Sequence, residues 1–238
     1  MTAPIRIAML SGPRNISTTI MRSFESRADT NVKDEPFYAC YLTKSGAKHP
    51  LREQILFSQA TEWSEVSQSL QAPLPAGIQY SFEKHIAFHF TFAPALDWLD
   101  GARVFHLIRN PVEMIASYKN KLDDVEPIID SYKIQRKLCE ESPAPIVDAT
   151  DILRAPEKML RKLCASLQIE FSDAMLSWPV GPRESDGVWA PHWYDAVLAS
   201  TGFKPYQEKE IKLSRELLEM ADRCMDDYNF FYARRLLP

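Results

Sequence analysis

Short apolar runs alternate along this chain with longer stretches in which apolar positions recur at helical spacing. The run IRIAMLS at 5–11 predicts a buried strand, and Ile20, Met21 and Phe24 then mark one side of a helix over 17–27. Further strands are predicted at 31–34, 78–82, 103–108 and 144–149. Strands separated by helical segments indicate a parallel α/β sheet, with ligands expected at the carboxyl ends of the strands.

The second half of the pattern contains more helix than strand. Pro111 is well placed in the first turn of a helix that continues through VEMIASYKNKL. Another helix is predicted to begin near Asp151, and the segment from about 206 to 236 is predicted to form an amphipathic C-terminal helix. The pattern contains no repeat, so we expect residues 1–238 to form one α/β domain.

Composition and charge narrow the classes of partner. The chain has 238 residues, of which 45% are hydrophobic, with a net charge of −4. This balance lacks the basic field of a nucleic-acid-binding protein, so we expect a small-molecule partner. No stretch approaches the roughly 20 apolar residues that cross a bilayer. Four scattered cysteines without metal-ligand spacing favour reduced thiols and a cytoplasmic location.

The segment SGPRNISTTIMR after the first predicted strand has the outline of a phosphate-binding loop. Arg14, Asn15, Ser17, Thr18 and Thr19 fall at the amino end of the first predicted helix, where free N–H groups and the helix dipole favour an anion. The loop lacks the lysine of a P-loop NTPase. The alternative is that Ser17 and Thr18 only cap the helix.

A second cationic position follows the strand predicted at 103–108. Arg109 ends that strand, and Ser117 lies two helical turns farther along, near the same helix face. Arg109 could also simply pair with a nearby carboxylate. Taken together, the two strand ends predict a ligand that carries two separated phosphates.

These segments resemble the sulfotransferases that use 3′-phosphoadenosine-5′-phosphosulfate (PAPS). GPRNISTTIMR resembles the family's 5′-phosphosulfate loop, and LIRNPVEMIASY resembles its 3′-phosphate motif at Arg109, Asn110, Pro111 and Ser117. RESDGVWAPHW is similar to the late loop that covers the nucleotide, with Arg183 and Gly187 in matching positions. The phosphate loop departs from the family pattern by one extra residue and by Ile16 or Ser17 in place of a glycine.

The resemblance implies both a fold and an activity. It implies a three-layer sandwich around a central parallel sheet, the P-loop NTPase-like sulfotransferase fold, with a lid-like loop at about 181–194. It also implies transfer of the sulfuryl group of PAPS to a hydroxyl or amine of a small molecule without a metal. Arg14, as the loop cation, would stabilise the leaving oxygen.

Two residues are candidates for the general base that the acceptor needs. Glu35 follows the second predicted strand, and His85 follows the third. We favour Glu35, whose neighbours in DEPFYACY could form the wall of an acceptor pocket. His85 and His89 could alternatively be metal ligands or core histidines. Lys84 would either hold the transferred sulfonate or pair with Glu35.

Two other classes of function stay open at this point. One is a P-loop nucleotide or metabolite kinase, which the missing lysine and the lack of an evident magnesium aspartate disfavour. The other is a nucleotide-binding protein of the same fold without turnover. The sequence leaves the acceptor and the oligomeric state undetermined.

Overall fold

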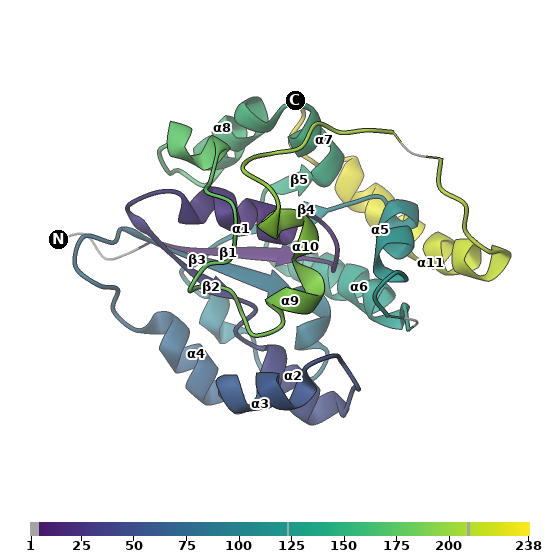
Figure 1. The fold of residues 1–238 in the computed structure, drawn as a ribbon, viewed down its shortest axis with the longest axis horizontal. Coiled ribbons are helices and arrows are strands. Elements are labelled where there is room, and N and C mark those ends of the chain that lie inside the picture. The colour runs from purple at the N-terminus through teal and green to yellow at the C-terminus, as the bar shows by residue number, and fades with distance from the viewer. Residues whose placement is uncertain (1–4, 123, 209) are drawn as a thin grey trace.

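A five-stranded parallel sheet lies at the centre of the computed structural model, which describes residues 5–122, 124–208 and 210–238 (Figure 1). The strand order is β2-β3-β1-β4-β5, and each neighbouring pair is parallel. The strands are β1 (Ile5–Ser11), β2 (Thr30–Asp34), β3 (Tyr80–Ile86), β4 (Arg103–Ile108) and β5 (Ile146–Asp148). The predicted parallel α/β sheet is therefore confirmed.

Helices connect the strands and cover the sheet. The helices are α1 (Ser17–Glu25), α2 (Tyr38–Ser45), α3 (Arg52–Ser58), α4 (Trp63–Gln71), α5 (Pro111–Tyr118), α6 (Glu126–Glu141), α7 (Ala149–Arg154), α8 (Pro156–Ser166), α9 (Ala190–Trp193), α10 (Asp195–Leu198) and α11 (Arg215–Tyr232). Short 3₁₀ helices are η1 (Ala87–Phe90), η2 (Asp97–Leu99) and η3 (Asp173–Leu176).

Alternating residues of β1 divide the core into two layers. Met9 packs in a cluster with Phe24 of α1 and with side chains of α8. Leu10 points to the other face and packs with Trp63 of α4 and with the fully buried Trp98. Figure 1 shows α1 and α8 on one side of the sheet and α4 on the other. Both faces are covered, which gives the expected three layers and explains why β1 and β4 read as apolar runs.

Side-chain caps fix the point where two helices follow their strands. Asn110 accepts a hydrogen bond from the Val112 N–H at 2.9 Å, and Pro111 is the first residue of α5. Asp148 at the end of β5 accepts from the Thr150 N–H at 2.8 Å and so begins α7. Such caps satisfy N–H groups that have no partner inside the helix.

Several expected boundaries were wrong. The helix after β4 ends at Tyr118 and not at Leu122, and β5 is limited to Ile146–Asp148. β3 runs to Ile86 and not to residue 82, so Lys84 and His85 lie within the strand. The helix expected from Asp151 is two helices, α7 and α8, because Ala155 leaves helical geometry before Pro156. The C-terminal helix α11 begins at Arg215 and not at residue 206. Its start is capped by the Ser214 hydroxyl, which accepts a hydrogen bond from the Leu217 N–H.

All four cysteines are free and buried, as expected for reduced thiols. Burial raises the pKa of Cys40 and Cys224 to about 12 and that of Cys164 to about 11. The pKa of Cys139 is raised for the same reason. Among the described helices, none is long and apolar enough to cross a membrane.

Candidate active site

A cavity of about 750 Å³ opens at the carboxyl ends of the central strands. It contains most of the residues that the sequence singled out. Those that line it are Arg14, Ser17, Thr18, Thr19, Glu35, Lys84, Arg109 and Ser117. Asn15, His85, Arg183 and Gly187 lie outside its lining. The predicted phosphate loop, the Arg109 motif and one candidate base therefore share a single cavity.

The loop between β1 and α1 bends sharply to bring α1 to this cavity. Arg14 and Ile16 have positive φ angles of 61° and 59°, a left-handed conformation that glycine adopts more readily. Ile16 precedes the helix without a side-chain cap, and the first turn carries no acidic residue. The amino end of α1 is thus available to an anion.

Asn15 supports this loop from beneath. Its side chain is fully buried, and its Nδ2 donates to the Leu107 carbonyl of β4 at 3.1 Å. Its Oδ1 has no partner among the described residues. Asn15 therefore ties the loop to the sheet, and no side-chain contact with the cavity is seen.

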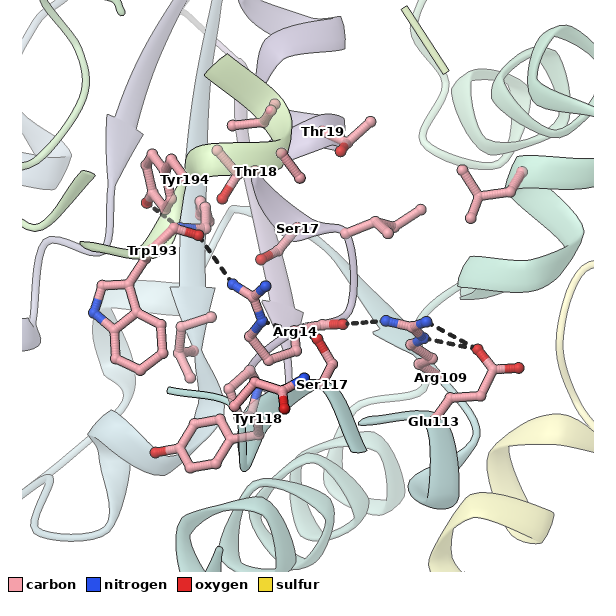
Figure 2. A pocket seen from close by; sticks show the side chains of 18 of the residues that line it. Arg14, Ser17, Thr18, Thr19, Arg109, Glu113, Ser117, Tyr118, Trp193 and Tyr194 are labelled. Carbon is pink, nitrogen blue, oxygen red and sulfur yellow. Dashed lines mark hydrogen bonds and ion pairs between the residues drawn. The ribbon is translucent and has the colours of Figure 1, made fainter. Parts of the chain in front are cut away.

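Arg14 lies near the centre of the cationic end of the cavity. Its Nε donates to Ser117 Oγ at 3.2 Å, and its Nη1 donates to the Trp193 carbonyl at 2.9 Å. Figure 2 shows its guanidinium between Ser17 and Ser117, with Arg109 farther along the same wall. Burial and the nearby Arg109 lower the pKa of Arg14. An anion placed between the two arginines would relieve this repulsion.

Arg109 is held in place by a carboxylate. Its Nε and Nη2 both lie 3.0 Å from Glu113 Oε2, and its Nη1 donates to the Arg14 carbonyl at 2.8 Å. Tyr206 donates to the other oxygen of Glu113 at 2.9 Å. The carboxylate pairing left open by the sequence is thus present, and Arg109 still lines the cavity.

Glu35 belongs to a buried charged cluster at the ends of β2 and β3. Lys84 Nζ donates to Glu35 Oε1 at 2.5 Å, to Asp34 Oδ1 at 2.8 Å and to the Tyr194 hydroxyl at 2.6 Å. Burial, partly offset by Lys84, raises the pKa of Glu35. Burial opposes the charge of Lys84, but Asp34 and Glu35 outweigh it and raise the pKa of that ammonium group. Of the two roles considered for Lys84, pairing with Glu35 is the observed one.

Aromatic rings surround Glu35, and one of them, Tyr38, belongs to the segment DEPFYACY that was expected to form the wall of an acceptor pocket. His89 Nε2 lies 3.9 Å from Glu35 Oε2, and its ring stacks on Tyr38. The Tyr38 hydroxyl bonds His49 Nδ1 at 2.7 Å. Burial lowers the pKa of His49 to about 4 and that of His89 well below its usual value, so both rings are neutral near pH 7. These residues line the cavity together with Trp193.

The structure does not bring His85 to the cavity. Successive side chains of a strand point to opposite faces, so Lys84 and His85 cannot both face the site. The ring of His85 lies against Trp98 in the core, and its Nε2 is 3.3 Å from Glu83 Oε2. Glu83 in turn pairs with Arg6. His85 is therefore a core histidine, which was one of the alternatives to its role as a base.

The late loop holds its two candidate residues in structural contacts. Arg183 donates to the Pro179 carbonyl and lies 3.9 Å from Glu25. The Gly187 N–H donates to Asp34 Oδ2 at 3.2 Å. A Cβ on Gly187 would lie 2.1 Å from the Trp189 ring, so glycine is needed there for close packing. Of the segment at 181–194, which was expected to form a lid, Trp193 and Tyr194 line the cavity.

No group of three potential metal ligands occurs in the described parts of the chain. His85 and His89, weighed earlier as a ligand pair, belong to β3 and to η1 respectively. They do not share one helix face.

Comparison with known proteins agrees with this geometry. The family model described as Sulfotransferase domain matches residues 5–234. The chain belongs to the sulfotransferase family. A sulfotransferase domain from the olefin synthase of Synechococcus PCC 7002 has a TM-score of 0.56 at 19% identity and covers 93% of this chain and 95% of that one. A sulfotransferase from Alicyclobacillus acidocaldarius has a TM-score of 0.56 at 12% identity, with 100% and 98% covered. At these identities the likeness shows the fold.

Curated relatives of this sulfotransferase domain are longer proteins. Branched-chain-amino-acid aminotransferase-like protein 2 of Arabidopsis thaliana is 32% identical over 227 residues, which are 92% of this chain and 40% of that protein. Protein 1 of the same name and organism is 32% identical over 237 residues, 96% of this chain and 42% of the relative. The chain therefore spans about two fifths of the relatives it matches.

Proposed function

We propose that this protein transfers the sulfuryl group of PAPS to a hydroxyl or amine of a small-molecule acceptor. The proposal rests on one observation, that a single cavity is lined both by cationic groups and by a buried carboxylate. Arg14, Arg109 and the uncapped amino end of α1 lie at one part of it, and the buried carboxylate Glu35 lies at another. Sulfuryl transfer needs cations at the leaving oxygen and a base at the acceptor.

The residues of the cationic end fit a nucleotide with two phosphate groups. Ser17, Thr18 and Thr19 would hold the 5′ group at the amino end of α1, and Arg109 with Ser117 would hold the 3′-phosphate. When bound, PAPS would supply an activated sulfuryl group. Because Glu113 already occupies one side of Arg109, a phosphate must share or displace that carboxylate.

Arg14 is suited to the leaving oxygen. Its guanidinium is fixed by Ser117 and by the Trp193 carbonyl, so little reorganisation is needed when charge develops next to it. Unlike a lysine, an arginine does not lose its proton when it is buried. Arg14 can therefore supply the charge that a lysine supplies in other phosphate loops.

Glu35 is the base that the geometry supports. It lines the cavity, whereas His85 does not, and its raised pKa makes the carboxylate a stronger proton acceptor than an exposed glutamate. Its Oε1 is held by Lys84, and its Oε2 lies on the side of His89. Oε2 would accept the acceptor's proton.

The part of the cavity next to Glu35 favours an acceptor without negative charge. Tyr38, Phe88 and Trp193 offer aromatic surface there, and the two lining histidines, His49 and His89, are neutral. The carboxylates of the buried cluster exceed its ammonium group by one negative charge. An anionic acceptor would be repelled in such a poorly solvated place.

Ligand-dependent melting tests the nucleotide site. Adenosine-3′,5′-bisphosphate should raise the Tm without magnesium, and AMP should raise it less. Arg109→Ala should weaken bisphosphate binding by roughly 2–5 kcal/mol, measured by calorimetry. Arg103→Ala is the control, because Arg103 begins the same strand and contacts the carbonyls of Leu167 and Gln168 at its far end. Equal shifts with AMP and the bisphosphate would refute a 3′-phosphate site.

A mass-spectrometric screen tests the reaction itself. The protein is incubated with PAPS and a metabolite mixture, and products that gain a sulfonate mass are identified. We expect uncharged or cationic hydroxyl or amine compounds among them. Bisphosphate binding with no transfer to any acceptor would instead favour the non-catalytic nucleotide-binding protein.

A further inference from the structure

The Lys84 ammonium has a complete set of hydrogen-bond acceptors. Its three N–H donors match three partners at 2.5–2.8 Å, namely Glu35, Asp34 and the Tyr194 hydroxyl. Its side chain is 1% exposed. To contact a transferred group directly, Lys84 would have to release one of these partners inside a poorly solvated cluster. Its observed contacts instead serve to hold the carboxylate of Glu35.

The Tyr194 hydroxyl is saturated as well. It accepts from Lys84 at 2.6 Å and from Trp189 Nε1 at 2.9 Å, and it donates to Asp34 Oδ2 at 2.7 Å. The Lys84 Nζ also lies 4.8 Å from the centre of the Tyr194 ring. Tyr194 lies between α9 and α10, 110 residues from Lys84 in the chain. One hydroxyl from a distant segment thus completes the contacts of both Asp34 and Lys84.

We propose that Tyr194 is a positioning residue for Glu35. By donating to Asp34 and accepting from Lys84, its hydroxyl keeps the ammonium shared between the two carboxylates. Glu35 Oε1 is then fixed on Lys84, and Oε2 is left toward His89. The inference rests on the proposed function only where it refers to a rate.

The residue before Tyr194 strengthens this assignment. The Trp193 carbonyl accepts from Arg14 Nη1 at 2.9 Å. Two consecutive residues therefore hold the cation at one end of the cavity and the charged cluster at the other. A shift of this dipeptide would move Arg14 and the charged cluster together. A fixed Tyr194 hydroxyl therefore helps to keep the distance between Arg14 and Glu35 constant.

Loss of the Tyr194 hydroxyl should change the proton affinity of Glu35 in a definite direction. Without that hydroxyl, Asp34 loses a donor and attracts the Lys84 ammonium more strongly, so Glu35 is less compensated and its pKa rises. Asp34→Asn removes the competing carboxylate and should lower the pKa of Glu35. The charged and titratable groups around Glu35 are Asp34, Lys84, Tyr194, His89, Tyr38 and Tyr118.

The primary test follows Glu35 directly. The carboxyl carbon of Glu35 is titrated by NMR in the unliganded wild type, in Tyr194→Phe and in Asp34→Asn, with Glu35→Gln used for assignment. Tyr228→Phe is the matched control, since its buried hydroxyl donates to the carboxylate of Asp148 outside the cavity. We expect the pKa of Glu35 to rise by about half to one unit in Tyr194→Phe, to fall in Asp34→Asn and to stay constant in the control.

The second readout is the pH profile of turnover with an acceptor found by the screen. Tyr194→Phe should lower kcat by about tenfold and move the acidic limb to higher pH, with bisphosphate affinity kept. Unchanged titration and profile in Tyr194→Phe would overturn the inference, as would equal changes in Tyr228→Phe. Because the NMR titration needs no donor or acceptor, it can succeed even where no sulfuryl transfer is found. If Tyr194→Phe does not fold, an unchanged pKa of Glu35 in Asp34→Asn would still overturn the inference, because the Lys84 ammonium would then not be shared between the two carboxylates.

Discussion

Residue 35 combines three features that are rarely found together. Glu35 is buried, it has a positive φ angle of 42°, and its carboxylate shares an ammonium group with Asp34. A left-handed backbone at a buried, charged residue is costly, and such costs tend to occur at functional sites. Burial and geometry therefore favour Glu35 over His85, a choice that the family resemblance alone leaves open.

Exchange of Glu35 for glutamine tests its role. Glu35→Gln keeps the size of the side chain but removes the basic oxygen, so turnover should fall by roughly 10²–10⁴. Bisphosphate affinity should barely change, because Glu35 follows β2, whereas Arg14 and Arg109 follow β1 and β4 on the other side of β3. Rate and affinity are both measured, since lost binding could imitate lost chemistry.

The matched control is His85→Gln. This side chain lies outside the cavity lining, so its variant should keep turnover and show its effect in stability. A large loss of turnover in His85→Gln, with normal turnover in Glu35→Gln, would exchange the roles of the two residues. Near-normal turnover in both would leave neither as the base.

Among the elements, the ones with strong local signals were predicted best. The units β1–α1 and β4–α5 combine an apolar run, a polar loop and a helix start within a few residues, and both have the expected order. The short helices α2, α3 and α4 lack such a signal. For example, α3 buries only Ile55, so its seven residues show no clear period.

The sequence could name the candidate site but not decide which side chains face it. A strand predicted to end at residue 82 leaves Lys84 and His85 in a loop, where both could reach a ligand. Once β3 continues to Ile86, alternation sends the two side chains to opposite faces. Asp34 and Tyr194 could not be found from local pattern, because their contact joins residues 160 positions apart.

The β1–α1 loop allows a test at the level of the element. Ile16 holds a left-handed conformation that costs a side chain with a Cβ about 1–2 kcal/mol and glycine almost nothing. Ile16→Gly and Ile16→Ala both lose the packing of the isoleucine, but only glycine relieves the strain. The glycine variant should therefore be more stable than the alanine variant by about 1 kcal/mol in urea unfolding.

In this result the glycine variant would be more stable than the alanine variant. Inside helices and strands the order is normally the opposite, because glycine there destabilises the protein relative to alanine. An alanine variant as stable as the glycine variant would show that the loop carries no strain at Ile16. The positive φ would then have no energetic consequence for the position of α1.

At the scale of the whole molecule, the buried histidines make the free energy of unfolding depend on pH. The chain has five histidines, and burial lowers the pKa of each of them. His49 and His106 have pKa values of about 4. Between that value and the unfolded value of about 6.5, the unfolded chain binds more protons than the folded one. The stability present above pH 6.5 is thus lost as the pH falls toward 4.

Unfolding by urea at a series of pH values measures this loss. Each histidine with a lowered pKa makes the free energy of unfolding decrease by up to about 1.4 kcal/mol for each pH unit below 6.5. His106→Asn should be less stable than the wild type at pH 7.5, because His106 fills a buried place next to Phe231, but its stability should depend less on pH. A slope equal to that of the wild type would contradict the assignment of His106 as a buried neutral ring.

The buried thiols have a practical consequence for spectroscopy. With their raised pKa values and little exposure, the native cysteines hardly form the thiolate that attacks maleimides near neutral pH. Two cysteines introduced at exposed positions, one in the phosphate loop and one in the segment at 181–194, would then take the fluorophores almost alone. The natural sequence thus already serves as a background for distance measurements between the phosphate loop and the segment at 181–194, without removal of any cysteine.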